Sequence, residues 1–159
     1  SCEPGRTFKT SLRRVQEDIF SFRPDVVFLM LGLEDSLQRG LLQPIFKDHV
    51  DDLMEMLRER NVFVIVLTPV GYRDSKGKHD PRSQRLMEFS DIITYSATYH
   101  HYPYIDINKY MANLCESNPE KYKTLFSDQI HLSEKGQKEV ADYIMNRIIN
   151  ALKGKPSKN

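Results

Sequence analysis

The residues best suited to chemistry are Asp128 and His131, which stand three positions apart in the segment FSDQIHLSEKG, residues 126–136. A carboxylate at this spacing can accept a hydrogen bond from the imidazole, which fixes the tautomer and the orientation of the ring. The other ring nitrogen can then act as a general base. Because a base of this kind usually serves a nucleophile, the sequence raises the question of where that nucleophile lies.

The same two residues also allow a structural interpretation. An aspartate and a histidine ahead of a helix can form a helix cap beside a partly exposed imidazole, and paired groups are often structural. Taken alone, the pair favours this second interpretation. The motifs elsewhere in the chain therefore decide between the two.

The elements that must position this pair alternate between strands and helices. Residues 26–31 and 62–67 are short apolar runs typical of buried parallel strands, and residues 104–107 predict a third strand. Apolar residues at helical spacing predict helices over residues 7–22, 44–60, 83–100 and 109–116, and a last helix after Leu132 with Ser133 as its N-cap. This alternation predicts a three-layer α/β/α fold with a parallel sheet and helices on both faces.

Sheets of this class hold their sites at the carboxyl ends of the strands. Residues 32–36 and 68–72, which we expect to be loops, follow the first two strands, and residues 117–123 read as a polar connector. We expect the segment that carries Asp128 and His131 to join the two loops at that edge of the sheet.

Length and composition limit the class of protein. A chain of 159 residues predicts a single domain, residues 1–152, with a disordered tail over residues 153–159. The proportions of hydrophobic (40%) and charged (28%) residues are ordinary for a soluble protein, and no apolar run approaches membrane-spanning length. A net charge of +1 makes nucleic acid an unfavoured partner. The first residues lack the charged segment followed by an apolar segment that is typical of a signal peptide, and the sequence does not indicate a cellular compartment.

Other reactive side chains give weaker signals. Cys2 and Cys115 have no metal-ligand spacing, and His100 and His101 lack partners at ligand spacing, so we expect no metal. Four tyrosines lie close together in the sequence and are expected either to pack in the core or to line a pocket: Tyr95, Tyr99, Tyr102 and Tyr104.

Four motifs in order along the chain resemble the SGNH (GDSL) hydrolases. Residues 24–35 resemble the strand of that family that ends in Gly-x-Asn-Asp, and residues 127–133 resemble its Asp-x-x-His motif. Residues 2–7 are similar to its glycine motif, and residues 67–69 fit a further strand end. The resemblance implies a flavodoxin-like α/β/α fold and a serine ester hydrolase that acts on acyl or acetyl esters without a cofactor.

The resemblance also implies roles for particular residues. His131 would be the general base and Asp128 the carboxylate that orients it. The oxyanion-hole region would include Gly5, Gly32 and Glu34, with the Gly5 N–H as a donor, although Gly5 taken alone reads as a turn glycine.

Two departures from the family concern its chemistry. The family begins with a strand that ends in Gly-Asp-Ser and carries the nucleophile, and no such motif occurs here, so the first strand is expected to be missing. The asparagine that donates to the oxyanion is replaced by Glu34. An ionised glutamate cannot donate a hydrogen bond, and the loss of one such donor typically costs about 2.7–4 kcal/mol.

Three residues are alternative nucleophiles. Asp35 and Ser36 could be a degenerate Gly-Asp-Ser with Ser36 as nucleophile, but this placement leaves room for too few strands before His131. Ser1 and Cys2 are weaker alternatives, since a reactive Cys2 would need a depressed pKa that the sequence cannot reveal.

Two functions therefore stay open. One is an SGNH-type ester hydrolase that takes a small acyl-ester substrate and whose nucleophile strand is absent, so that this polypeptide could be inactive. The other is a non-catalytic SGNH-like module that binds protein or RNA, as the Oskar domain does. In either case a missing strand leaves a sheet edge that predicts a homodimer, a partner segment or poor solubility.

Overall fold

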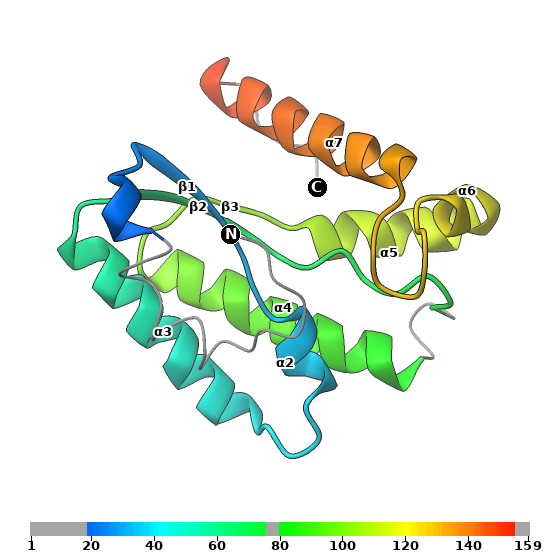
Figure 1. The fold of residues 1–159 in the computed structure, drawn as a ribbon, viewed down its shortest axis with the longest axis horizontal. Helices are drawn as coiled ribbons and strands as arrows, with labels where there is room; N and C mark the ends of the chain where they lie inside the picture. The colour runs from blue at the N-terminus through cyan, green and yellow to red at the C-terminus, as the bar shows by residue number, and fades with distance from the viewer. Residues whose placement is uncertain (1–18, 76–79, 155–159) are drawn as a thin grey trace.

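Three short strands form a parallel sheet with helices on both sides (Figure 1). This computed structural model describes residues 19–75 and 80–154. In chain order the described elements are η1 (Phe20–Phe22), β1 (Val26–Met30), α2 (Leu33–Leu37), α3 (Gln43–Glu59), β2 (Phe63–Leu67), α4 (Pro81–Tyr99), β3 (Tyr104–Ile105), α5 (Ile107–Ser117), α6 (Pro119–Thr124) and α7 (Glu134–Leu152).

The order of the strands in the sheet is β1-β2-β3. Val26 pairs with Phe63 and Met30 with Leu67, while Leu67 also pairs with Ile105 of β3. Because all three strands run in the same direction, the segments that follow them meet at one edge of the sheet. The predicted α/β fold with a parallel sheet is confirmed.

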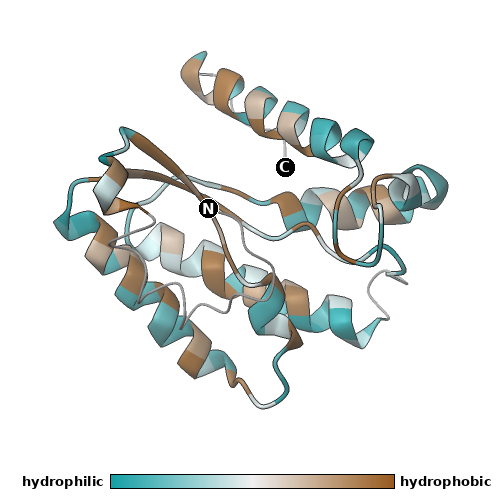
Figure 2. Cartoon of the chain, viewed as in Figure 1, coloured by the Kyte–Doolittle hydropathy of each residue, from teal (hydrophilic) through white to brown (hydrophobic). Residues whose placement is uncertain are grey.

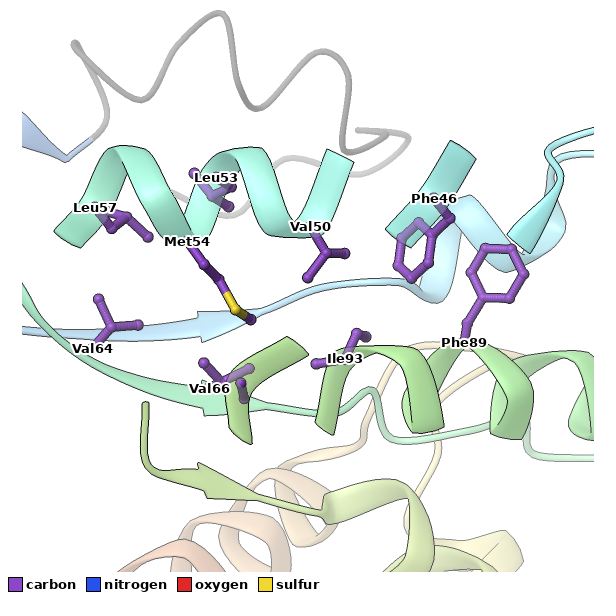
Figure 3. Packing of buried hydrophobic residues seen from close by; sticks show 10 residues of the cluster. Phe46, Val50, Leu53, Met54, Leu57, Val64, Val66, Phe89 and Ile93 are labelled. Carbon is purple, nitrogen blue, oxygen red and sulfur yellow. The ribbon is translucent and has the colours of Figure 1, made fainter. Parts of the chain in front are cut away.

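The first hydrophobic core lies between the sheet and the pair α3 and α4 (Figure 3). Val64 and Val66 of β2 point into it and are fully buried. From the helices, Phe46 and Phe89 bring their rings to 4.4 Å between centroids. Truncation of such a ring to alanine typically costs about 3–5 kcal/mol, so this core supports the whole β1-to-α4 unit.

The second core lies toward α5, α6 and α7. It is formed by Leu67, Val70, Ile105, Ile107, Met111, Cys115, Tyr122, Leu125, Phe126 and Val140. Helix α7 contributes one stripe to it, and the segment before α7 contributes Leu125 and Phe126. This core therefore fixes the place of the segment that carries Asp128 and His131.

One face of β1 stays open to solvent. Val27 and Leu29 pack against the first core, whereas Val26, Phe28 and Met30 alternate with them and are 44–51% exposed. Phe63, which pairs with Val26, is 54% exposed. Figure 2 shows both strands as hydrophobic along their length. Parallel strands are normally covered on both faces, and this face is not. The homodimer or partner segment was predicted for the sheet edge, and it stays a prediction.

Two segments predicted as irregular form short helices. Residues 32–36 contain most of α2, and the connector predicted over residues 117–123 contains α6. Helix α6 forms because Pro119 occupies its first turn and the Asn118 side chain accepts a hydrogen bond from the backbone N–H of Lys121. Both predictions of loop structure were wrong at these places.

Three element boundaries also differ from the prediction. The third strand ends at Ile105, because Asp106 caps α5 by accepting from the N–H of Lys109. Helix α4 begins at Pro81, where Asp80 accepts from the N–H of Arg82. Of the helix predicted over residues 7–22, only Phe20–Phe22 form a described helix, of the 3₁₀ type, and residues 7–18 lie outside the described residues.

The ends of the predicted domain are described in part. Lys153 and Gly154 form a turn after α7, and the remainder of the predicted tail lies outside the described residues. Among the helices that the structure describes, none has the length and apolar character needed to cross a bilayer.

Candidate active site

A tight turn over residues 126–132 presents the aspartate and the histidine. Phe126 and Leu132 form an isolated antiparallel bridge at its base, and the Ser127 N–H donates to the His131 carbonyl at 2.9 Å. Oδ1 of Asp128 accepts from the backbone N–H groups of Ile130 at 2.9 Å and His131 at 2.8 Å. The Asp128 carboxylate thus fixes the backbone of the turn as well as the imidazole.

The side chains of Asp128 and His131 form a close pair. Nδ1 of His131 donates to Oδ2 of Asp128 at 2.7 Å, and both side chains are 55% exposed. Hydrogen bonds from the backbone N–H groups of His131 and Ile130, followed by the bond from the imidazole, lower the pKa of Asp128 to about 2. At neutral pH the carboxylate is therefore ionised. Nε2 of His131 makes no hydrogen bond to any described residue, which leaves it open to a substrate or nucleophile.

The turn is held against the loop that follows β2. The Arg73 N–H donates to the Gln129 carbonyl at 2.9 Å, and the Gln129 side chain donates to the Asp74 carboxylate. On its other side the turn leads into α7, whose N-cap Ser133 accepts from the Gly136 N–H at 3.2 Å. The predicted N-cap is confirmed, and the predicted proximity of the turn to the loop after β2 is observed.

Gly136 allows α7 to begin this close to the turn. A Cβ built on Gly136 would lie 1.9 Å from the Leu125 carbonyl oxygen, a backbone atom that cannot move aside easily. Any other residue at position 136 would displace the start of α7 and with it the turn that carries His131.

The segment after β1 forms a second part of the same edge. Gly32 has a φ of +97°, and a Cβ on it would lie 2.9 Å from the Ile93 side chain, so both conformation and space require glycine. Glu34 follows in the first turn of α2, partly exposed, and makes no hydrogen bond to another described residue. The structure thus places a carboxylate on the segment where the resemblance implies an oxyanion donor.

Ser36 is buried and already bonded. Its exposed fraction is 5%, and its hydroxyl donates to the Leu33 carbonyl at 2.7 Å. Since the single Ser36 proton is used in that bond, Tyr72 is the donor in the 2.9 Å bond between the two hydroxyls. Burial, the largest influence, raises the pKa of Tyr72. No described bond links Ser36 to His131.

Several residues that sequence reasoning missed support these segments. Arg85 of α4 donates to the carbonyls of Ser36 at 2.7 Å and Leu41 at 2.7 Å, which fixes the end of α2. Tyr72, Gln129 and Asp74 link the three segments to one another. Only Tyr72 had a sequence signal, its place just after a strand. Gly5, Ser1 and Cys2 lie outside the described residues, so their predicted roles stay predictions.

The described residues contain no group of three or more histidine, cysteine, aspartate or glutamate side chains arranged to hold a metal ion. The arrangement as it stands suits proton transfer, with an oriented imidazole at the carboxyl edge of the sheet.

Comparison with known proteins identifies the family. Residues 3–139 match the GDSL-like Lipase/Acylhydrolase family. The chain belongs to the GDSL-like Lipase/Acylhydrolase family. A comparison with curated proteins found no match.

Solved structures support the fold of this GDSL-like chain. An acetyl xylan esterase matches with a TM-score of 0.82 and 23% identity, over 93% of this chain and 79% of that one. An acetylxylan esterase from Geobacillus stearothermophilus matches with a TM-score of 0.79 and 18% identity, over 91% of this chain and 68% of that one. A lipase/acylhydrolase from Enterococcus faecalis matches with a TM-score of 0.71 and 24% identity, over 98% of this chain and 75% of that one. The family and these neighbours indicate an esterase-type domain with the SGNH hydrolase fold.

Proposed function

We propose that this domain serves in the hydrolysis of acyl esters, with His131 as the general base and Asp128 as the carboxylate that orients it. The observation that carries the proposal is the 2.7 Å bond from His131 Nδ1 to an Asp128 carboxylate whose other oxygen is held by two backbone N–H groups. This bond fixes the tautomer in which Nε2 is unprotonated and able to accept a proton.

The proposed reaction follows from that tautomer. Nε2 accepts the proton of a serine hydroxyl as its oxygen attacks the acyl carbon, and the imidazolium then gives this proton to the departing alkoxide. A water molecule, deprotonated in the same way, cleaves the acyl-enzyme to acid and free serine. Asp128 stays ionised throughout and stabilises the imidazolium, which its low pKa allows.

The nucleophile in this proposal lies outside the described residues. Ser36 is assigned a structural role, because its hydroxyl is buried and engaged by the Leu33 carbonyl and by Tyr72. The Glu34 carboxylate would slow the reaction, since an ionised carboxylate repels the oxyanion that forms during attack.

The substrate class is an acetyl or short acyl ester carried by a sugar. The resemblance of the fold to two acetyl xylan esterases supports this choice. The open position of the Asp128–His131 turn supports it further, because an exposed base can reach an ester on a large polymer.

The test measures turnover of p-nitrophenyl acetate and labelling by a fluorophosphonate probe. We expect His131→Ala to lower turnover by about 10²–10⁴-fold and to abolish labelling, as loss of a general base does. His101→Asn is the matched control, because His101 is exposed with a φ of +61°, a conformation that asparagine tolerates. Ser36→Ala should keep the label. Equal activity of His131→Ala and the unmodified chain would refute the proposal.

A second candidate function is a non-catalytic binding module, which the carboxylate of Glu34 in the oxyanion region favours. Absence of both turnover and labelling would support the module and contradict ester hydrolysis by this polypeptide. The coding sequence ahead of Ser1 gives an independent check, since a strand ending in Gly-Asp-Ser there would supply the nucleophile.

A further inference from the structure

Two cavities meet beside β3 and α5, and neither Asp128 nor His131 lines them. The larger, about 830 Å³, is lined by Thr98, His101, Tyr102, Pro103, Tyr104, Asp106, Lys109, Tyr110, Asn113, Tyr143 and Arg147. The smaller, about 370 Å³, lies between α4 and α5 and shares Asp106, Lys109 and Asn113 with the larger. The shared residues make the two cavities one groove, called here the β3 groove.

Aromatic side chains form much of the wider part of the β3 groove. Tyr104 is 44% exposed there. The rings of Tyr110 and Tyr143 are stacked with centroids 4.0 Å apart, and the Tyr110 hydroxyl donates to Glu139 at 2.6 Å. The Tyr102 hydroxyl donates to the Met54 carbonyl at 3.2 Å. Three of the four rings are therefore held in place before any ligand arrives, which lowers the entropic cost of binding.

Polar groups line the junction of the two cavities. Lys109 and Asn113 stand four residues apart on α5, and their side chains make no hydrogen bond to a described residue. Oδ1 of Asp106 accepts from Thr68 at 2.9 Å and from the Lys109 N–H at 3.0 Å, which orients its carboxylate. Asn108 also lines the smaller cavity, where its side-chain amide can form hydrogen bonds with a ligand.

The charges along the groove are mixed. Asp91, Asp106 and Glu116 contribute carboxylates, against the cations Lys109 and Arg147. This balance gives no attraction for a polyanion such as RNA, which binds to continuous positive potential. Donors and acceptors beside flat aromatic rings instead match a ligand with apolar ring faces and many hydroxyl groups.

We infer that the β3 groove binds a short stretch of saccharide chain, with a sugar ring against Tyr104 and hydroxyl groups bonded by Asp106, Lys109 and Asn113. The choice of ligand rests on the proposed function, in which the ester is carried by a sugar. Neither Asp128 nor His131 lines the β3 groove, so binding and ester cleavage depend on different residues.

The experiment titrates the chain with xylohexaose, cellohexaose and chitohexaose and follows backbone amide shifts by NMR. We expect saturable shifts in α5 and around Tyr104 with at least one hexasaccharide, and an affinity about tenfold weaker in Tyr104→Ala, as loss of one aromatic contact predicts. Asn113→Ala, at an exposed helix position, should weaken binding in the same direction. Tyr99→Ala is the matched control, since Tyr99 is exposed on α4 and does not line the groove.

The outcomes separate this inference from the proposed function. Because the assay measures binding, His131→Ala should bind saccharide with unchanged affinity, and Tyr104→Ala should keep full turnover of p-nitrophenyl acetate. Failure of all three hexasaccharides to bind would overturn the inference and leave the hydrolase proposal standing. So would an affinity in both Tyr104→Ala and Asn113→Ala that equals the affinity of the unmodified chain. Saturable binding of poly-U RNA that is lost in Lys109→Ala would also overturn it.

Discussion

Among the described residues, two aspartate–histidine pairs lie in opposite environments. Asp128 and His131 lie in an exposed turn with a 2.7 Å bond between carboxylate and imidazole. Asp51 of α3 and His100, which follows α4, are joined by a longer bond of 3.3 Å, and the His100 side chain is only 7% exposed. Nδ1 of His100 is buried without a described hydrogen-bond partner.

The comparison shows that access, rather than pairing, separates a candidate catalytic pair from a structural one. Burial, the largest influence, acts to raise the pKa of Asp51, but the hydrogen bond from Lys47 and the positive charge of that side chain help to lower the pKa below its ordinary value. The Asp51 carboxylate therefore bonds to neighbouring side chains of the protein. In the exposed pair every described bond leaves Nε2 of His131 open, so the ring can exchange a proton with a substrate.

The largest expected effect is on turnover when the orienting carboxylate is removed. Asp128→Asn should lower kcat for p-nitrophenyl acetate by about 10³–10⁴-fold, because the amide stabilises the wrong imidazole tautomer. Asp51→Asn, its counterpart in the buried pair, should leave kcat within about twofold. Equal losses in the two variants would remove the distinction between the pairs.

The next effect concerns Glu34. Replacing this carboxylate with a donor in Glu34→Asn should raise kcat by about tenfold or more, since one oxyanion donor is worth about 10²–10³-fold in enzymes with a complete site. Steady-state kinetics with p-nitrophenyl acetate measures the gain. Glu88→Gln, an exposed change on α4, is the control, and an unchanged or lower kcat in Glu34→Asn would place Glu34 outside the oxyanion region.

The free energy of unfolding should depend more on the buried pair than on the exposed pair. His100→Ala should lower the free energy of unfolding by about 1–3 kcal/mol, because Asp51 loses a partly buried partner and a void forms between α3 and α4. His131→Ala should change it by less than about 0.5 kcal/mol, as exposed substitutions do. Urea denaturation followed by circular dichroism gives both values. A larger loss in His131→Ala would show that the exposed pair is structural.

The smallest effect is a dependence of stability on acid. The pKa of Asp128 falls from 3.8 to about 2 on folding, so its contribution is complete above pH 4 and is lost as the pH falls through about 2. Unfolding midpoints between pH 5 and pH 2 should therefore fall less steeply in Asp128→Asn than in the unmodified chain. Identical profiles would show that Asp128 has an ordinary pKa in the folded state.

The parts predicted correctly from sequence depend on local pattern. The strands at residues 26–31 and 62–67 are continuous apolar runs. The Ser133 hydroxyl caps α7 by accepting from the N–H of Gly136, three residues on, and Asp128 bonds to His131 within the same tight turn. Each of these relations involves neighbours in the sequence, where spacing and residue type decide the structure.

The parts that were missed depend on distant partners. The Tyr72 hydroxyl meets Ser36 across 36 positions, Arg85 meets the Ser36 carbonyl across 49, and Gln129 meets Asp74 across 55. Only the folded sheet brings such residues together, and no spacing rule reports them. The short helix α2 was missed for a related reason, since its residues are helical only where Gly32 turns the chain and Arg85 holds its end.

The open face of β1 affects how the folded state can be monitored. Val26, Phe28, Met30 and Phe63 form an apolar surface on an ordered strand pair, where a fluorescent dye such as ANS can bind without any unfolding. Dye fluorescence is commonly read as a sign of a molten globule with lost side-chain packing. For this chain we expect a bright dye signal together with a native near-ultraviolet circular dichroism spectrum, so thermal shift assays based on such dyes should begin from a high baseline.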